Sequence, residues 1–271
     1  MATIPNELLE FAEDPGAFVE IGPDEERVAT PRSSVTFSPG EHFWSTSVTR
    51  VRFGPDEVGA GVGEIRELMT ARGRTAAAWA LGPSATPPAV AERLIEQGLE
   101  SESDEGSVIL VLTDAPVVSP TPFRVKRIAT FEDHLAAIEV GNEGFDFTAA
   151  DADDERRRAR ATFDAELAGG HSARLLALDG DRPVATGQAW RSPFGLYLGG
   201  GATIPSHRRR GAMSALAAAA WEEAVASGTP VLVTHGGRLA ASVLERLGFR
   251  PAGLVHHLID RGDRNPLYGK A

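Results

Sequence analysis

The sequence predicts an α/β (α+β) protein of two domains, each with a mixed, mostly antiparallel sheet flanked by helices. Apolar segments with strand-like and helix-like spacing alternate along the 271 residues, and three prolines fall within residues 114–122. The charge also changes there, because residues 1–120 carry 20 acidic and 8 basic side chains, whereas residues 121–271 carry 18 acidic and 19 basic ones. Since the chain is long for a single core, we expect domains at 1–116 and 117–271.

The composition excludes several classes of function. The absence of cysteine excludes disulfides, thiolate metal sites and cysteine nucleophiles. A net charge of −11 argues against nucleic acid as a partner. No apolar run reaches the roughly 18 residues of a membrane span, and the acidic N-terminus does not resemble a signal peptide. We therefore expect a cytoplasmic protein without a membrane or nucleic-acid partner, and the sequence leaves its oligomeric state open.

The second half predicts the order β-α-α-β-β-β-α-β-α-β. Thr130 can cap the first helix, turns at Asp179–Asp181 and Ser192–Pro193 separate three apolar strands, and Gly228 ends a long helix that begins near Arg208. These strands suit an antiparallel meander. The expected strands are 123–129, 173–178, 183–190, 195–203, 231–234 and 252–260, and the expected helices are 131–140, 153–168, 208–227 and 238–247.

The first half partly repeats this order. It predicts strands at 48–53, 76–81 and 107–112 and helices at 57–71 and 88–97. Residues 91–99 are similar to residues 241–249, and the loop at 56–61 has the spacing of the loop at 208–213. Two carboxylates, Asp56 and Glu57, replace arginines, so a repeated first half would repel an anion at this loop. Chance similarity of two βαβαβ segments is the alternative.

The loop at residues 208–213, which we call the arginine loop, has the pattern of an anion site. A glycine-rich strand ends before it and a helix follows it. The first turn of a helix presents backbone N–H groups without partners and a partial positive charge. Arg208, Arg209 and Arg210 add charge, and Gly211 permits a close approach. A solvated helix start is the alternative, but cations there oppose the helix dipole.

These features resemble the GNAT superfamily of acyl-CoA-dependent N-acyltransferases. The family's loop reads Arg or Gln, two residues, Gly, one residue, then Gly or Ala, and Arg208, Gly211 and Met213 occupy these three positions. The closing helix and Gly-Phe of the family match Leu244–Phe249. The resemblance covers residues 123–260, and the whole chain resembles a tandem member whose N-terminal GNAT-like half is degenerate.

The resemblance implies an N-acetyltransferase that uses acetyl-CoA as co-substrate and no metal. The acceptor would be a primary amine of a small molecule or peptide that attacks the thioester directly, while a main-chain N–H stabilises the oxyanion. The strand expected to pair with the pantetheine arm contributes Gly201, Ala202 and Thr203. The amides expected to hold the pyrophosphate are those of Arg209, Arg210, Gly211, Ala212, Met213 and Ser214. Arg208 would fix the loop or reach a phosphate.

Two departures from the family concern proton transfer. Leu244 occupies the position of the tyrosine that protonates the leaving thiolate, and Gly237 occupies that of a frequent asparagine. His235 and Ser242 are candidates to replace the tyrosine, and His235 also has a pKa range suited to a general base. Glu143, or its neighbour Asp146, can bind the charge of the amine or relay its proton; ordinary capping and loop roles remain open for all of them.

Two other classes of function remain open. The first is a non-catalytic acyl-CoA-binding or regulatory module, which the missing tyrosine favours. The second is a purely structural pair of domains. Ligand binding separates the structural pair from the other two, and thiol release with an amine separates the enzyme from the binding module.

Overall fold

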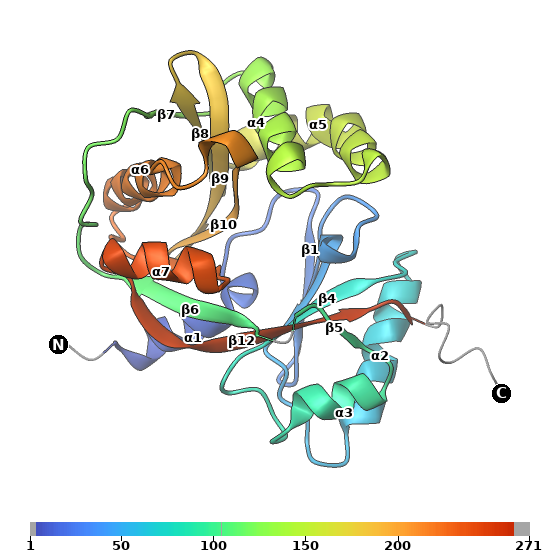
Figure 1. Cartoon of the computed structure of the whole chain (residues 1–271). Coiled ribbons are helices and arrows are strands. Elements are labelled where there is room, and N and C mark those ends of the chain that lie inside the picture. Colours follow the sequence, from blue (N-terminus) through green and yellow to red (C-terminus); the bar gives the residue numbers. More distant parts are fainter. Residues whose placement is uncertain (1–3, 104, 263–271) are drawn as a thin grey trace. The chain divides into compact units, whose positions relative to one another are not determined.

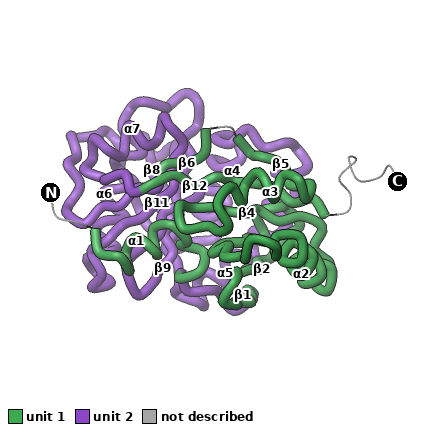
Figure 2. Tube along the Cα trace, turned by 90° about the horizontal axis from the view of Figure 1, so that it is seen from below, with its two compact units in different colours: residues 1–18, 24–108, 253–271 green, residues 19–23, 109–252 purple. Residues whose placement is uncertain are grey.

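The described chain forms two compact units. The computed structural model describes residues 4–103 and 105–262. Unit 1 holds the described parts of residues 1–18, 24–108 and 253–271, and unit 2 holds residues 19–23 and 109–252 (Figure 2). The ends of the predicted domains, residues 1–3 and 263–271, lie outside the described residues. The predicted division between residues 116 and 117 concerns folding domains, which compact units do not test, and it stays a prediction.

The sheet of unit 2 is mixed and mostly antiparallel, with the strand order β6-β11-β10-β9-β8-β7 (Figure 1). The strands are β6 (Ser107–Leu112, of which 109–112 belong to this unit), β7 (Arg124–Arg127), β8 (Ser172–Asp179), β9 (Arg182–Ser192), β10 (Gly195–Thr203) and β11 (Leu232–Gly236). β7 to β10 are antiparallel neighbours, and β11 runs parallel to β10. The predicted meander is confirmed.

Helices of unit 2 cover both faces of this sheet. They are α4 (Phe131–Gly144), α5 (Ala149–Gly169), α6 (Ala212–Ala226) and α7 (Arg238–Arg246), with a short 3₁₀ turn at Pro205–His207. Ala137 of α4 packs against Leu176 of β8. The adjacent Leu175 points to the opposite face, because side chains alternate along a strand, and it lines a cavity with Leu216 of α6. Thus α4 and α6 lie on opposite faces.

Local chemistry sets the helix starts. The hydroxyls of Thr130 and Thr148 accept hydrogen bonds from the amides of Asp133 (3.2 Å) and Asp151 (3.3 Å), as N-caps do. The expected start of α6 near Arg208 is wrong, because the helix begins at Ala212.

The physical reason for the later start of α6 is the backbone of the arginine loop. Arg209 and Gly211 adopt φ values of 63° and 94°. These left-handed conformations cannot belong to a right-handed helix.

Unit 1 has a second mixed sheet, with the order β1-β2-β3-β4-β12 and with β5 also paired to β12. Its strands are β1 (Glu26–Ala29), β2 (Ser34–Phe37), β3 (Thr46–Thr49), β4 (Ala77–Leu81), β5 (Glu100–Ser101) and β12 (Arg250–Asp260). Its helices are α1 (Asn6–Glu13), α2 (Val58–Thr70) and α3 (Val90–Glu96), with 3₁₀ turns at Pro15–Ala17 and Phe43–Ser45. The sequence did not predict α1, β1, β2 or β5.

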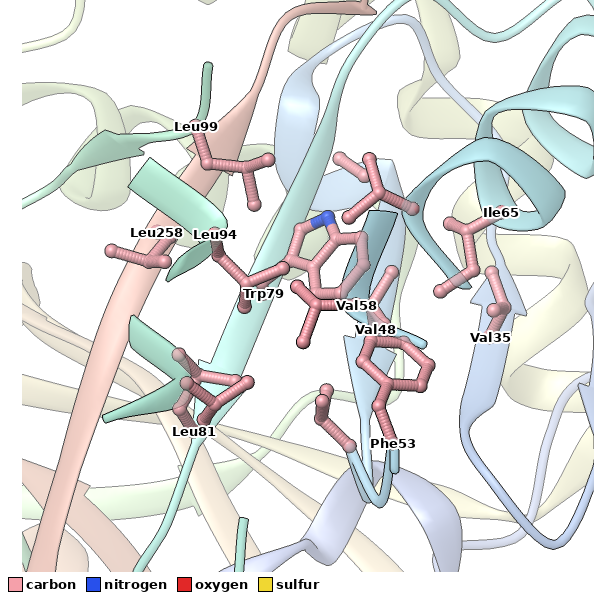
Figure 3. Packing of buried hydrophobic residues seen from close by; sticks show 14 of the residues in the cluster. Val35, Val48, Phe53, Val58, Ile65, Trp79, Leu81, Leu94, Leu99 and Leu258 are labelled. Carbon is pink, nitrogen blue, oxygen red and sulfur yellow. The ribbon is translucent and has the colours of Figure 1, made fainter. Parts of the chain in front are cut away.

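The core of unit 1 surrounds Trp79 of β4, which is fully buried (Figure 3). Val48 and Leu94 belong to the same cluster. A buried ion pair lies at the end of β12, where Asp260 accepts hydrogen bonds from Nε (3.0 Å) and Nη2 (2.9 Å) of Arg66 on α2. Such a bidentate pair satisfies the buried carboxylate and fixes the strand end to the helix.

Candidate functional site

A β-bulge lies on β10 where this strand stops pairing with β11. Gly199 lies opposite Gln188 of β9, but three residues later Ala202 lies opposite Thr186, so β10 contains one extra residue. Gly200 inside the bulge has a φ of 59°, which favours glycine. The parallel pairing with β11 ends at Leu198, whose carbonyl accepts a hydrogen bond from the hydroxyl of Thr234 (2.9 Å).

A cavity of about 300 Å³ lies where the two strands stop pairing, and α6 and α7 contribute to it. This volume is within the range of small-molecule sites. Most of its lining is aliphatic or glycine. The lining residues are Phe145, Leu175, Gly187, Gln188, Leu198, Gly199, Gly200, Gly201, Met213, Leu216, Ala217, Ala220, Thr234, His235, Gly236, Gly237, Ala240 and Leu244.

The arginine loop and the residue after it present six successive backbone amides, from Arg209 to Ser214. Within the described residues, none of these N–H groups donates to a protein acceptor, and the first amide with one is that of Ala215, which donates to Gly211 (3.0 Å). The last three amides belong to the first turn of α6. Free amides at the positive end of a helix dipole form a site for an anion.

The three arginine side chains have different surroundings. Arg208 donates to two carbonyls, those of Thr203 (3.2 Å) and Gly144 (2.9 Å). It therefore fixes the loop to β10 and α4, one of the two roles considered for it.

The other two arginines differ in their availability to an anion. Arg210 pairs with Asp179 (2.9 Å) and lies over the ring of Phe123. Arg209 is exposed, and in the part of the chain that the structure describes its guanidinium has no protein partner. Arg209 is thus the arginine best placed to meet an anion.

Two features of the structure require glycine at position 211. A Cβ at this position would lie 3.0 Å from Cγ2 of Thr121, and the φ of 94° is unfavourable for any other residue. A larger side chain here would displace either the segment around Thr121 or the arginine loop.

Three polar side chains line the cavity: Gln188, Thr234 and His235. Nη2 of Arg174 donates to Oε1 of Gln188 (2.9 Å), and Nε2 of Gln188 donates to Glu166 (3.0 Å), so this amide is held in place. Thr234 already donates to a carbonyl. His235 is the only titratable side chain among the lining residues of the described chain.

Two of these polar residues were missed from the sequence. Gln188 reaches the cavity because of its register opposite Gly199, which no local pattern reveals. Thr234 directly precedes the predicted candidate His235, and its place at the end of a strand was the available signal.

The other two candidate catalytic residues lie elsewhere. Ser242 on α7 is exposed and donates to the carbonyl of Leu239 (3.0 Å). Glu143 is exposed near the end of α4. Neither belongs to the cavity lining, whereas Leu244 and Gly237 both do. The structure thus brings His235 together with the bulged strand and does not bring Ser242 or Glu143 there.

Burial alters two ionisable groups of unit 2. Burial raises the pKa of Tyr197, beside His235, to about 12, so this phenol is neutral at physiological pH. His134 on α4 is fully buried, and burial, reinforced by the charge of Arg174 and opposed by that of Glu166, lowers its pKa to about 4. His134 is therefore neutral as well.

The corresponding place in unit 1 is closed by the chain itself. After β3, the carbonyl of Val51 accepts from the amide of Thr86 (3.1 Å), and the amide of Phe53 donates to the carbonyl of Thr86 (3.2 Å). The ring of Phe53 lies 2.5 Å from where a Cβ of Gly61 would be. Glu57 accepts from the amide of Gly54 (2.9 Å). Backbone bonds thus close the gap after the strands that remains open in unit 2, while a separate pocket of unit 1 lies between the starts of α2 and α3 and is lined by acidic residues such as Asp56 and Glu92.

Residues 4–103 and 105–262 contain no helix long and apolar enough to cross a membrane. They also contain no cluster of three or more His, Asp or Glu side chains arranged to bind a metal ion. The expected absence of a metal stays a prediction.

Comparison with known proteins gives a consistent family and fold. A family model described as the acetyltransferase (GNAT) family matches residues 136–249. No curated protein matches the sequence. A solved GCN5-related N-acetyltransferase from Kribbella flavida is 22% identical with a TM-score of 0.67, covering 88% of this chain and 90% of that chain.

Two other solved structures extend the likeness. A tandem GNAT protein from the clavulanic acid biosynthesis pathway is 14% identical with a TM-score of 0.57, covering 97% of this chain and 90% of that chain. A GCN5-related N-acetyltransferase from Sphaerobacter thermophilus is 16% identical with a TM-score of 0.52, covering 84% and 80%. At these identities the likeness concerns the fold, and it confirms the predicted fold class over most of the chain.

Proposed function

We propose that unit 2 is an acyltransferase that transfers the acetyl group of acetyl-CoA to a primary amine, a proposal that the match of residues 136–249 to the acetyltransferase (GNAT) family model supports. The acceptor is a small molecule or a peptide. The observation that carries this proposal is the combination of six free amides in the arginine loop with a cavity at the bulged strand.

The residues of unit 2 fit acetyl-CoA. The amides of residues 209–214 suit the pyrophosphate, and Arg209 is available to add charge. The edge of β10 at Gly201–Thr203, beyond its pairing with β11, suits the amides of the pantetheine arm, which would bind as an added strand. Bound acetyl-CoA supplies an activated thioester. The cavity is the place for its reactive end.

The chain's own groups position the acceptor and move its proton. The nitrogen of a neutral amine forms a bond to the thioester carbon while the carbon–sulfur bond breaks. Amides near the bulge at Gly199–Gly201 are suited to stabilise the charge that develops on the oxygen. We assign the proton of the amine to His235, directly or through water, because it is the only acid–base side chain in the described cavity lining.

The leaving thiolate needs little help in this scheme. Its pKa is near 8 or 9, so it departs without a strong acid and takes a proton from solvent or from His235. The tyrosine expected from the family is replaced by the buried Leu244, which lines the cavity. Ser242 and Glu143 remain secondary candidates, since neither lines it.

A binding module without catalysis is the second candidate function. The observation that favours it is the same Leu244, which places an aliphatic side chain where the family has a proton donor. A binding module would retain the arginine loop but would release no thiol.

Thermal melting and thiol release test both functions. At about 100-fold above Kd, acetyl-CoA stabilises by about 2.7 kcal/mol, which corresponds to a rise in melting temperature of about 5–10 °C. Substitution Gly211→Val should abolish this rise, because it displaces the loop. Gly141→Ala is the matched control, since this helical glycine of unit 2 has open space around it.

The outcomes separate the proposals. A rise together with thiol release when an amine is added supports the enzyme. A rise without thiol release across a broad panel of amines favours the binding module. If Gly211→Val melts normally and still responds to acetyl-CoA, the arginine loop does not hold the ligand.

A further inference from the structure

An aromatic surface lies on one side of the sheet beside the cavity of unit 2. Trp190 and Tyr197 are cross-strand partners on β9 and β10, and their rings stack with centroids 5.8 Å apart at 28°. The edge of Tyr197 faces His235, with centroids 5.7 Å apart at 66°. The ring of Trp190 covers Gly199, where a Cβ would lie 2.9 Å from it.

A second aromatic pair comes from the connection between α4 and α5. Phe145 lines the cavity and is 48% exposed, and its ring stacks on Phe147 with centroids 5.8 Å apart at 24°. We call Phe145, Phe147, Trp190 and Tyr197 the aromatic wall: Phe145 lines the cavity, and each of the other three lies against a lining residue, namely Phe145, Gly199 and His235 respectively. Trp190, Tyr197 and Phe147 are half-buried, so the wall is partly open. Large exposed aromatic side chains at a cavity indicate a binding surface for an apolar group.

The lack of charged side chains in the described cavity lining also favours an apolar ligand. No Asp, Glu, Lys or Arg belongs to the lining in the described chain. Glu166 reaches the lining only through Gln188, and its Oε1 already accepts from Arg174 (2.8 Å). A second positive charge that enters the cavity would find no carboxylate in this lining to pair with, and burying an unpaired charge is costly.

We propose that the acceptor of unit 2 is a primary amine on an aromatic or other apolar skeleton that carries no further positive charge. The inference rests on the proposed acetyl transfer and names its substrate class. The apolar skeleton packs against the aromatic wall, and the amine lies near His235. Polyamines, aminoglycosides and peptides with several cationic groups are then poor acceptors.

The same surroundings favour the reactive form of the amine. Desolvation in an uncharged, aromatic site disfavours the ammonium form and lowers the pKa of the bound amine. The neutral amine then attacks the thioester carbon, the carbon–sulfur bond breaks, and one proton leaves nitrogen as one is taken up by sulfur. The apparent pKa of the rate with bound amine should therefore lie below that of the free amine.

The test uses the full chain with acetyl-CoA and compares amines that differ in skeleton and charge. We expect kcat/KM for thiol release with 2-phenylethylamine to exceed that with spermidine or kanamycin by at least about tenfold. Substitution Phe145→Ala should raise KM for 2-phenylethylamine about tenfold with little change in kcat, and Phe145→Tyr should restore it. Leu167→Ala, at another exposed apolar position that lies on α5 outside the cavity lining, is the control and should have no effect.

Binding to the protein with CoA gives a readout that does not require turnover. Calorimetry should show 2-phenylethylamine binding to this complex and about tenfold weaker binding after Phe145→Ala. If this binding is seen but no amine releases thiol, the proposed catalysis fails while the acceptor class stands. A preference for spermidine or kanamycin, equal behaviour of Phe145→Ala and Leu167→Ala, or no binding of 2-phenylethylamine would overturn the proposed acceptor class.

Discussion

Arg208, Arg209 and Arg210 carry the same charge but make different contacts. Arg208 holds two carbonyls, Arg210 is neutralised by Asp179, and Arg209 projects from a left-handed backbone without a partner among the described residues. A run of like charges in the sequence predicts an anion site, but it does not show which of the charged side chains already bind other groups of the protein. The contacts of each guanidinium decide that.

The buried side chain of His134 should make the stability of unit 2 depend on pH. His134 has a folded-state pKa of about 4 against an ordinary value of 6.5. Its neutral form is therefore favoured by folding: the stability is fully present above pH 6.5 and is lost as the pH falls toward 4. Between pH 7.5 and 5 the loss from this group is about 2 kcal/mol.

Urea unfolding at the two pH values measures this contribution. Substitution His134→Leu places an apolar side chain in this buried site and removes the group that binds a proton. The free energy of unfolding of the variant should fall less between pH 7.5 and 5 than that of the parent protein, by about 2 kcal/mol. An equal fall in both proteins would show that His134 is not held neutral.

At the scale of elements, α5 shows how a weakly amphipathic helix is fixed. Three of its residues are buried, Ala152, Ala159 and Phe163, and its charged side chains pair with one another along the surface. Its start depends on the Thr148 hydroxyl, which accepts from the amide of Asp151. The position of this helix therefore depends on its cap, on few core contacts and on polar contacts to other elements, such as those of Glu166 with Arg174 and Gln188.

Removal of that cap should be measurable. We expect Thr148→Ala to lower the free energy of unfolding by about 1 kcal/mol, because an orphan amide loses its acceptor. Thr148→Ser retains the hydroxyl and should lie within a few tenths of a kcal/mol of the parent protein. Chemical denaturation of the three proteins compares them, and equal losses for both variants would exclude capping as the cause.

The corresponding elements of the two units differ where the site is concerned. A strand was expected at 48–53, but β3 ends at Thr49, and residues 51–53 bond to Thr86 instead. On β10 the bulge and the end of pairing with β11 leave an open edge. The glycines at 199–201 permit the bulge of β10, whereas the end of β3 follows from the bonds that its backbone makes with Thr86.

At the scale of the whole molecule, one chain should bind one acetyl-CoA. Unit 2 has free amides, arginines and an apolar cavity, whereas in unit 1 Thr86 bonds across the strand end and the pocket at the corresponding loop is lined by Asp56, Glu92 and Glu96, which repel an anion. Calorimetric titration should give a stoichiometry near one per chain, and none for Gly211→Val. Two equivalents, or one equivalent that survives Gly211→Val, would assign binding to unit 1.

Two strands lie across the division at residues 116 and 117 that the sequence predicts. The sheet of unit 1 ends with β12, from the C-terminal part of the chain, and the sheet of unit 2 includes residues of β6, which follows α3 in sequence. An apolar strand pattern records burial but does not identify the neighbouring strand. For this reason the sequence predicted both strands at nearly the right residues and predicted neither pairing.

The sequence alone determined the alternation of helices and strands, the meander and the position of the arginine loop. Hydrophobic periodicity, caps and glycine positions are local, and short segments of chain express them. Only the tertiary structure decided that Gln188 lies opposite the bulge of β10, that Ser242 does not line the cavity, and that Thr86 bonds to the segment after β3. These outcomes depend on register and on contacts between residues far apart in the chain, and no local pattern encodes them.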